Sequence, residues 1–334
     1  MAKDTLILLL ACLLGAKNLS LAQGTSLKCI ETPVKSTFTK SVHSVVEKYL
    51  PMALAWEDRP PEQHRTVAEN LIVVTADGLR WQEVFQGVPP SSPLARGTGN
   101  NLGLARENLM PFFWETLAKH GQVYGNRLYG NEVSVANRIR ISYPGYSEII
   151  CGHPDDKRII LNSKKQNPNR SVFEWLNRQR RYRGRVAVFG SWELFSYIFN
   201  EDRSKIPVNA GFEPIQPRDR TPLTEEQKRL NGLLDSTPRR WHDHVRPDSL
   251  TWAFAKEYME RCQPRAVFLG FGETDEFAHE GNAAGYLQAI ARFDSLLGEI
   301  WRFIESNDHY RGKTALLITT DHGRGRNNWR AHNP

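Results

Sequence analysis

The sequence predicts an α/β fold of three layers, an αβα sandwich in which helices cover both faces of a mostly parallel central sheet. Four short apolar runs contain many β-branched residues, and such runs are typical of strands buried on both faces. Segments with helical spacing of their apolar residues separate these runs, and strands that alternate with helices form βαβ units. Three of the four runs end at an aspartate, which indicates a site at one edge of the sheet.

The chain has 334 residues, 40% of them hydrophobic, and can supply the core of one large domain or two modest ones. We expect one domain over 71–334, an N-terminal extension over 23–70, and an insertion or cap over 200–245, where Pro, Asp and Arg are frequent. The runs expected to be strands are NLIVVTADG from Asn70, RVAVFG from Arg185, RAVFLGFGETD from Arg265 and KTALLITTD from Lys313.

Helix signals lie between the strands. Pro111 suits the first turn of a helix that ends at Gly121, because proline lacks an N–H group that the first turn leaves unbonded. Ser171 and Glu174 have the spacing of a capping box. Two longer amphipathic patterns cover 249–262 and 286–304.

The N-terminus, MAKDTLILLLACLLGAKNLSLAQG, resembles a secretory signal peptide. Lys3 precedes a short apolar core over 6–14, and the small residues Ser20 and Ala22 are placed for cleavage after residue 22. The core is too short to span a bilayer, so we expect a secreted or periplasmic protein with no transmembrane segment. LLAC, ending at Cys12, is an alternative lipoprotein cleavage site.

Charge and cysteine content exclude several classes of function. Lys and Arg total 44 against 37 Asp and Glu, but these charges are scattered, so we expect no nucleic-acid partner. The densest basic run, Arg178–Arg185, is expected to be a solvated helix end. Cys29, Cys151 and Cys262 remain after processing, an odd number that allows at most one disulfide. Because no C-x-x-C pair occurs, a metal would need carboxylate and imidazole ligands.

Carboxylates and imidazoles gather where the parallel strands are expected to end. In open α/β sheets ligands bind beyond the carboxyl ends of the strands. Any one of the aspartates alone would fit a helix N-cap or a turn, but histidines accompany two of them. Such a mixture suits two divalent cations, and zinc is the most natural choice. The candidates are Asp77, Asp275, His279, Asp321, His322 and His332.

A nucleophile is expected in RIRISYPGYSEIICG. Two cations about 3.5–4 Å apart can clamp the attacking and leaving oxygens of a displacement at phosphorus. Ser142 lies just before Pro144, at the start of a helix expected to run through Ile150, and a helix N-terminus favours an anion. Ser142 could instead cap that helix, although Gly145 stands where a capping box has Glu or Gln.

The ordered set VTADGLR, SYPGYSEIICG, GETDEFAHEG and TTDHGRG, from about Leu71 onward, resembles the alkaline phosphatase superfamily, in its type I phosphodiesterase and nucleotide pyrophosphatase-like branch. The resemblance implies hydrolysis of small-molecule phosphate mono- or diesters, with Ser142 as the nucleophile that forms a phosphoserine. It implies two metal groups: Asp77, Ser142, Asp321 and His322 around one ion, and Asp275, His279 and His332 around the other.

Two features depart from the family pattern. The histidine downstream of the Asp–His pair comes early here, at His332, and the family fold usually continues further, so the resemblance implies C-terminal truncation. Nucleotide pyrophosphatases commonly have Asn after the Pro of the nucleophile motif, where this chain has Gly145. Another donor to phosphate is therefore needed. Arg138, Arg140 and Asn126 are candidates, although each also fits an ordinary surface position.

Other functions stay open at this point. A sulfatase needs Cys or Ser followed two residues later by Pro and then by Arg, and CGHPD at Cys151 lacks this pattern. Phosphoglycerate mutase-like members are cytoplasmic, which the signal peptide disfavours. A binding protein that has lost turnover on the same scaffold is a third alternative. Trp192 and Tyr197 would stack on a substrate in an enzyme, or pack in the core.

Overall fold

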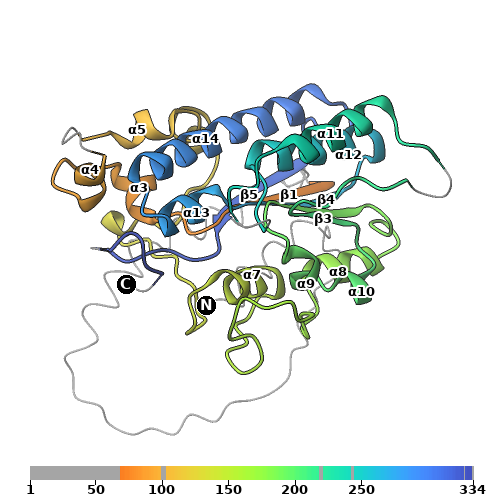
Figure 1. Ribbon diagram of the computed structural model, residues 1–334, viewed down its shortest axis with the longest axis horizontal. Coiled ribbons are helices and arrows are strands. Elements are labelled where there is room, and N and C mark those ends of the chain that lie inside the picture. The colour runs from red at the N-terminus through yellow and green to blue at the C-terminus, as the bar shows by residue number, and fades with distance from the viewer. Residues whose placement is uncertain (1–67, 99–102, 218–220, 242–243, 327, 333–334) are drawn as a thin grey trace, which may run out of the picture. The chain divides into compact units, whose positions relative to one another are not determined.

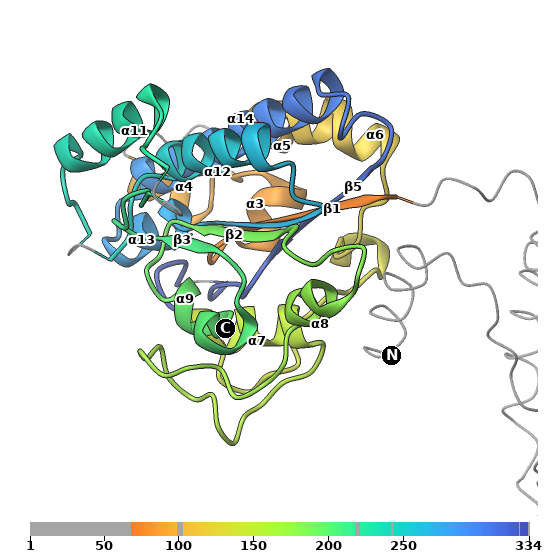
Figure 2. The ribbon, with the colours of Figure 1, turned by 90° about the vertical axis from the view of Figure 1, so that its right-hand side faces the viewer.

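The computed structural model describes residues 68–98, 103–217, 221–241, 244–326 and 328–332. The expected signal peptide over 1–22 lies outside these residues, as does nearly all of the expected extension over 23–70. From Glu69 onward the described chain belongs to one compact unit. Helices lie on both faces of a central sheet, so the unit is the αβα sandwich that the sequence predicts (Figures 1 and 2).

The sheet has five strands in the order β3-β2-β4-β1-β5, and every neighbouring pair is parallel. All residues of β1, β2 and β4 are buried, as expected for strands covered on both faces. The apolar run of β5 predicts an equally buried strand, but β5 is largely half-buried because it lies at the edge, beside β1 alone. The strands are β1 (Asn70–Ala76), β2 (Val186–Gly190), β3 (Val208–Ala210), β4 (Ala266–Phe271) and β5 (Thr314–Thr320).

Part of the segment expected to be an insertion or cap, 200–245, belongs to the sheet itself. Val208–Ala210 forms β3, which pairs with β2 at the edge opposite β5. The same segment supplies two helices, the short α10 (Glu201–Ser204) and α11 (Glu225–Ser236). Helix α11 packs beside α12 (Asp248–Cys262). A three-residue strand is too short to show a period in the sequence, so the segment lacks a strand signal.

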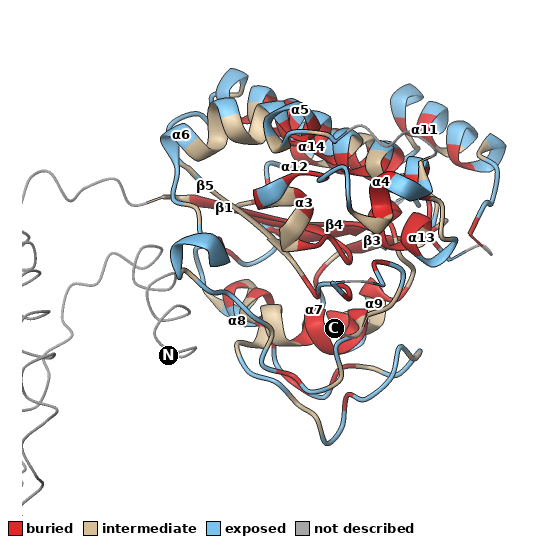
Figure 3. Ribbon diagram, turned by 90° about the vertical axis from the view of Figure 1, so that its left-hand side faces the viewer, coloured by how far each residue is buried: buried red, intermediate tan, exposed pale blue. Residues whose placement is uncertain are grey.

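The helices divide between the two faces of the sheet. One layer, above the sheet in Figure 2, is built on α12 and α14, and the other contains α7, α8 and α9. Buried residues on the helices face the sheet in Figure 3. The first layer comprises α3 (Trp81–Gln86), α4 (Pro93–Gly97), α5 (Arg106–Leu109), η2 (Phe113–Leu117), α6 (Ala118–His120), α12 (Asp248–Cys262) and α14 (Ala283–Ser306). The second comprises α7 (Ser142–Cys151), α8 (Val172–Arg178) and α9 (Phe195–Ile198), with η3 (Arg127–Tyr129) before α7. The short helix α13 (Glu273–His279) follows β4 and packs against α14.

The helix expected from Pro111 to Gly121 is present and contains a π-helical stretch, η2. Its first turn is capped from another element, because the buried Asp294 of α14 accepts hydrogen bonds from the backbone N–H groups of Phe112 and Phe113, at 2.8 Å each. This carboxylate satisfies two donors that a helix start leaves without partners.

The capping box expected at Ser171 and Glu174 is only half formed. Ser171 Oγ accepts from the backbone N–H of Glu174 at 3.0 Å, as expected. The Glu174 carboxylate does not return to Ser171. It binds Arg178 at 2.7 Å and Arg203 at 2.9 Å, because two guanidinium groups attract a buried carboxylate more strongly than one backbone N–H does.

In the described part of the chain, no helix is both long enough and apolar enough to cross a membrane. Cys151 and Cys262 are free thiols, and Cys29 lies outside the described residues.

The cap on the helix from Pro111 leads to a stability prediction. Asp294→Ala should lower the free energy of unfolding by about 1–3 kcal/mol, because two backbone N–H groups lose their acceptor. Denaturant unfolding measures this loss. Asp308→Ala, which removes an exposed aspartate that pairs with Arg311, is the control and should change stability by less than about 0.5 kcal/mol. Equal effects of the two substitutions would contradict the capping role.

Candidate metal centre

The three aspartates expected at strand ends lie together at one edge of the sheet. Asp77 directly follows β1 and Asp321 directly follows β5, while Asp275 lies in the first turn of α13, just after β4. Since β4, β1 and β5 are neighbours and parallel, their carboxyl ends meet. All three side chains are buried.

One group of possible ligands consists of Asp77, Asp321 and His322, whose ligand atoms all lie within 4.8 Å of one another. His322 Nε2 is 3.3 Å from Asp77 Oδ1 and 3.5 Å from Asp321 Oδ2. The other ring nitrogen, Nδ1, lies 2.9 Å from the carbonyl oxygen of Gly323 and can donate to it, which leaves Nε2 as the free ligand atom. Burial acts to lower the pKa of His322, but the charges of Asp321 and Asp77 outweigh it and raise the pKa to about 10.

The second group consists of Asp275, His279 and His332, again within 4.8 Å. Asp275 and His279 are one helical turn apart on α13, as their spacing predicts, and Asp275 Oδ2 is 2.9 Å from His279 Nε2. His332 arrives from the last described residues and places its Nε2 2.8 Å from His279 Nε2. The structure thus brings His332, the most distant candidate in sequence, to the other two.

Ser142 is the first residue of α7, and its side chain is buried between the strand ends. Its Oγ lies 3.3 Å from Asp77 Oδ1 and 3.3 Å from His322 Nε2. The alternative role as an N-cap is not realised, because Ile141 occupies the N-cap position and no side chain there makes a capping hydrogen bond. The hydroxyl therefore faces the first ligand group at the positive end of a helix.

Two glycines, Gly145 and Gly78, allow α7 and the ends of the strands to approach one another closely. A Cβ at Gly145 would lie 2.4 Å from the backbone oxygen of Asp321, so α7 can pack against the end of β5 only with glycine at this position. Gly78 has φ +62°, and a Cβ there would lie 2.5 Å from Asp275 Oδ1. The Gly78 N–H donates to Asp321 Oδ1 at 3.0 Å, which fixes that carboxylate. Gly145, a departure from the family motif, thus has a packing reason.

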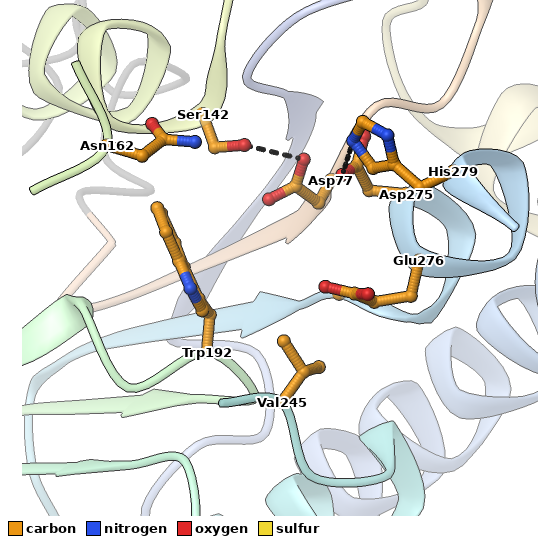
Figure 4. Close-up of a pocket in the computed structure, with 9 residues that line it drawn as sticks. Asp77, Ser142, Asn162, Trp192, Val245, Asp275, Glu276 and His279 are labelled. Carbon is orange, nitrogen blue, oxygen red and sulfur yellow. Dashed lines mark hydrogen bonds and ion pairs between the residues drawn. The ribbon is translucent and has the colours of Figure 1, made fainter. Parts of the chain in front are cut away.

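The structure adds Asn162, which the sequence did not single out. Its Oδ1 accepts from the backbone N–H of Tyr143, the second residue of α7, at 2.9 Å. The Nδ2 group consequently points toward Ser142 (Figure 4). Of the donors expected from the sequence, Asn126 caps η3 instead, Arg138 is exposed beside Asp156, and Arg140 is exposed as well. Asn162 lies in a loop twenty positions after Ser142, where no local pattern marks it.

A second addition is Arg324, which donates to Asp275 Oδ1 and to the backbone oxygen of Asp275. Its other terminal nitrogen donates to the backbone oxygen of Arg330 at 2.6 Å. Arg324 therefore holds the second ligand group to the segment that carries His332. The sequence offered a signal in TTDHGRG, where this arginine follows the Asp–His pair closely.

A cavity of about 150 Å³ opens onto both ligand groups. Figure 4 shows Ser142, Asn162 and the ligands on one side, with Trp192, Val245 and Glu276 around the rest. Burial, together with the charges of Asp275 and Asp77, raises the pKa of Glu276 to about 7. Trp192 thus faces the cavity, whereas the other aromatic candidate, Tyr197, is not among its lining residues.

The chemistry of the donors fits divalent cations. The three buried carboxylates lie close together, and in the described part of the chain the guanidinium group that pairs with one of them, Asp275, is that of Arg324. Asp321 Oδ2 is buried and has no hydrogen-bond partner among these residues, so an acceptor stands unsatisfied at the centre of the site. The Nε2 atoms of His279 and His332 face each other at 2.8 Å, so both imidazoles present a ring nitrogen at the same place. Oxygen and imidazole ligands of this kind suit zinc and similar ions.

Comparison with known proteins supports metal use. Residues 245–332 match the model of the Metalloenzyme superfamily. The matched region contains the whole second ligand group together with Asp321 and His322, whereas Asp77 and Ser142 lie outside it. The match makes this part of the chain similar to the Metalloenzyme superfamily and supports the use of a metal. No curated protein matches the chain.

Gly145 provides a test of the packing between α7 and β5. Gly145→Ala should lower the free energy of unfolding by about 1–3 kcal/mol and weaken metal binding, because its Cβ would collide with the backbone of Asp321. Gly232→Ala in α11 is the matched control. Apart from the backbone of its own helix and its chain neighbours, nothing in the described part of the chain lies within 4 Å of a Cβ added there, and alanine should stabilise the helix by up to about 1 kcal/mol. Thermal unfolding with and without zinc compares the two, and a neutral or stabilising Gly145→Ala would contradict the packing described.

Proposed function

We propose that the chain is a hydrolase of small phosphate mono- or diesters that uses two divalent cations, most naturally Zn²⁺, and forms a covalent phosphoserine at Ser142. The observation that carries the proposal is the position of Ser142 Oγ, at a buried helix start and 3.3 Å from both Asp77 and His322. The superfamily match supports metal use, and the resemblance to type I phosphodiesterases and nucleotide pyrophosphatases supports the reaction class.

In this proposal each ligand group would hold one cation: Asp77, Asp321 and His322 with Ser142, and Asp275 with His279 and His332. When bound, the two cations would neutralise the charge of the ester and stabilise the attacking and leaving oxygens. Arg324 would keep the second group assembled, because it contacts Asp275 and the backbone beside His332.

The chain's own residues would position and transfer the phosphoryl group. Ser142 Oγ would attack phosphorus as the ester oxygen leaves, and water would then hydrolyse the phosphoserine. Asn162 would donate its Nδ2–H to a phosphate oxygen beside Ser142, since Tyr143 already holds its Oδ1. The N-terminus of α7 adds its partial positive charge at the same place. The signal-like N-terminus motivates the further proposal that this chemistry takes place outside the cytoplasm.

The nucleophile is tested with Ser142→Ala. This variant should lose about 10³-fold or more in kcat toward bis-p-nitrophenyl phosphate and p-nitrophenyl phosphate. Ser147→Ala, in the same helix but outside the cavity, should keep activity. Quenched protein with ³²P-labelled substrate should carry label only when Ser142 is present. Full activity of Ser142→Ala would remove it as the nucleophile, and turnover confined to p-nitrophenyl sulfate would exclude a phosphate ester hydrolase.

The phosphate donor is tested by comparing two asparagines. Asn162→Ala should lower kcat by about 10²–10³-fold, because one positioned donor to the developing negative charge is lost. Asn126→Ala removes a cap of η3 and should leave kcat unchanged. Steady-state kinetics on bis-p-nitrophenyl phosphate measures both variants. The opposite ranking would show that the donor is not Asn162.

A further inference from the structure

One side of the cavity is not used by the two ligand groups. Trp192 lies just after β2, and β2 is the neighbour of β4 on the side away from β1. Asp275, Asp77 and Asp321 follow the next three strands, β4, β1 and β5, in that order. In Figure 4 the Trp192 ring and the Glu276 carboxylate stand on opposite sides of the same space, with Val245 beneath them. This arrangement places an aromatic face and a carboxylate next to the phosphate position.

Glu276 differs from the other glutamates of its helical segment. Glu273 pairs with Arg292 at 2.6 Å, and Glu280 pairs with Arg240 at 2.8 Å. Glu276 lines the cavity, belongs to neither ligand group, and has no hydrogen-bond or ion-pair partner among the described residues. A partly buried carboxylate without a partner favours a cation beside it. No lysine or arginine side chain lines this cavity in the described part of the chain.

The wall opposite Glu276 is held rigidly. Trp192 and Val245 form an antiparallel bridge, and flanking backbone hydrogen bonds join Glu193 to His244 at 2.9 Å and Arg246 to Ser191 at 3.0 Å. Trp192 is partly buried and packs against the core, so its ring is supported from behind. The face of an indole attracts a cation, and a desolvated site strengthens the attraction.

We propose that Trp192 and Glu276 form a subsite for a small organic cation, so that the preferred substrate is a phosphate ester of a short amino alcohol. The inference rests on the proposed function, because the phosphate of such a substrate has to bind beside Ser142 and Asn162. The cavity, at about 150 Å³, is smaller than the 300–1,000 Å³ usual for drug-sized ligands and suits a compact ammonium head group better than a nucleotide.

A pair of isosteric substrates tests the subsite. p-Nitrophenyl phosphorylcholine carries a quaternary ammonium group, and p-nitrophenyl 3,3-dimethylbutyl phosphate replaces that nitrogen with carbon. The wild-type protein should prefer the charged ester by about tenfold or more in kcat/KM. Glu276→Gln should bring the ratio to about one, because the charged ester should lose far more of its kcat/KM than the neutral ester does. Trp192→Leu should lower the ratio, and Trp192→Phe should keep part of it.

Glu280→Gln is the matched control, because it removes the same charge from the end of the same helix but outside the cavity. The ratio of kcat/KM for the charged ester to that for the neutral ester should be the same in Glu280→Gln as in the wild type. A wild-type ratio near one, in protein that hydrolyses bis-p-nitrophenyl phosphate, would overturn the subsite and leave the proposed function intact. Equal loss of both esters in Glu276→Gln would also overturn it, because Glu276 would then act in the chemistry itself.

A binding measurement decides the question independently of turnover. Calorimetric titration of zinc-loaded Ser142→Ala with choline phosphate and with 3,3-dimethylbutyl phosphate should show tighter binding of choline phosphate, and Glu276→Gln in the same background should abolish the difference. Equal affinities would overturn the subsite. If choline phosphate is preferred but no phosphate ester is hydrolysed by the wild-type protein, the proposed function is wrong and the subsite stands.

Discussion

The convergence of three carboxylates at the ends of β4, β1 and β5 is the constraint on which the site depends. Asp77, Asp275 and Asp321 are buried together, and the Arg324 guanidinium and the imidazoles of His279, His322 and His332 lie against them. Burial, reinforced by the charge of Asp77, raises the pKa of Asp321 well above its usual value. Burial works in the same direction on Asp275, but His279, His332 and Arg324 outweigh it and hold its pKa low. Uncompensated buried charge is costly, so this edge of the sheet is built either to bind cations or to retain protons.

The same constraint explains how the surrounding segments are held. The segment after β5, which carries Arg324 and His332, is anchored to the start of α3: Arg80 pairs with Glu83 and donates to the backbone oxygen of Gly325 at 2.8 Å. Trp329 stacks on Tyr286 of α14, with ring centroids 5.5 Å apart. The second ligand group therefore relies on contacts from elements far apart in sequence. On the other side of the site, α7 is brought against the strand ends by the absence of a side chain at Gly145.

Much of this arrangement is predictable from the sequence, because it follows from periodic patterns. Buried parallel strands appear in the sequence as apolar runs, and the carboxyl ends of such strands meet at one edge of the sheet. Helical spacing places Asp275 beside His279. What escapes prediction depends on contacts without a local pattern. Asn162 is oriented by a backbone N–H of α7, and β3 is too short to have a period. In the sequence, Gly145 stands where the family motif commonly has an Asn that donates to phosphate. In the structure, only glycine at this position lets α7 pack against the backbone of Asp321.

The central claim, that the two ligand groups hold two cations, is tested most directly by metal stoichiometry. Equilibrium dialysis against zinc followed by elemental analysis should find two zinc ions per chain in the wild-type protein. Removing both histidines of the second group, as His279→Ala with His332→Ala, should leave one ion, bound by Asp77, Asp321 and His322. A wild-type protein that binds no zinc, manganese or magnesium under these conditions would contradict the claim, as would a double variant that still binds two ions.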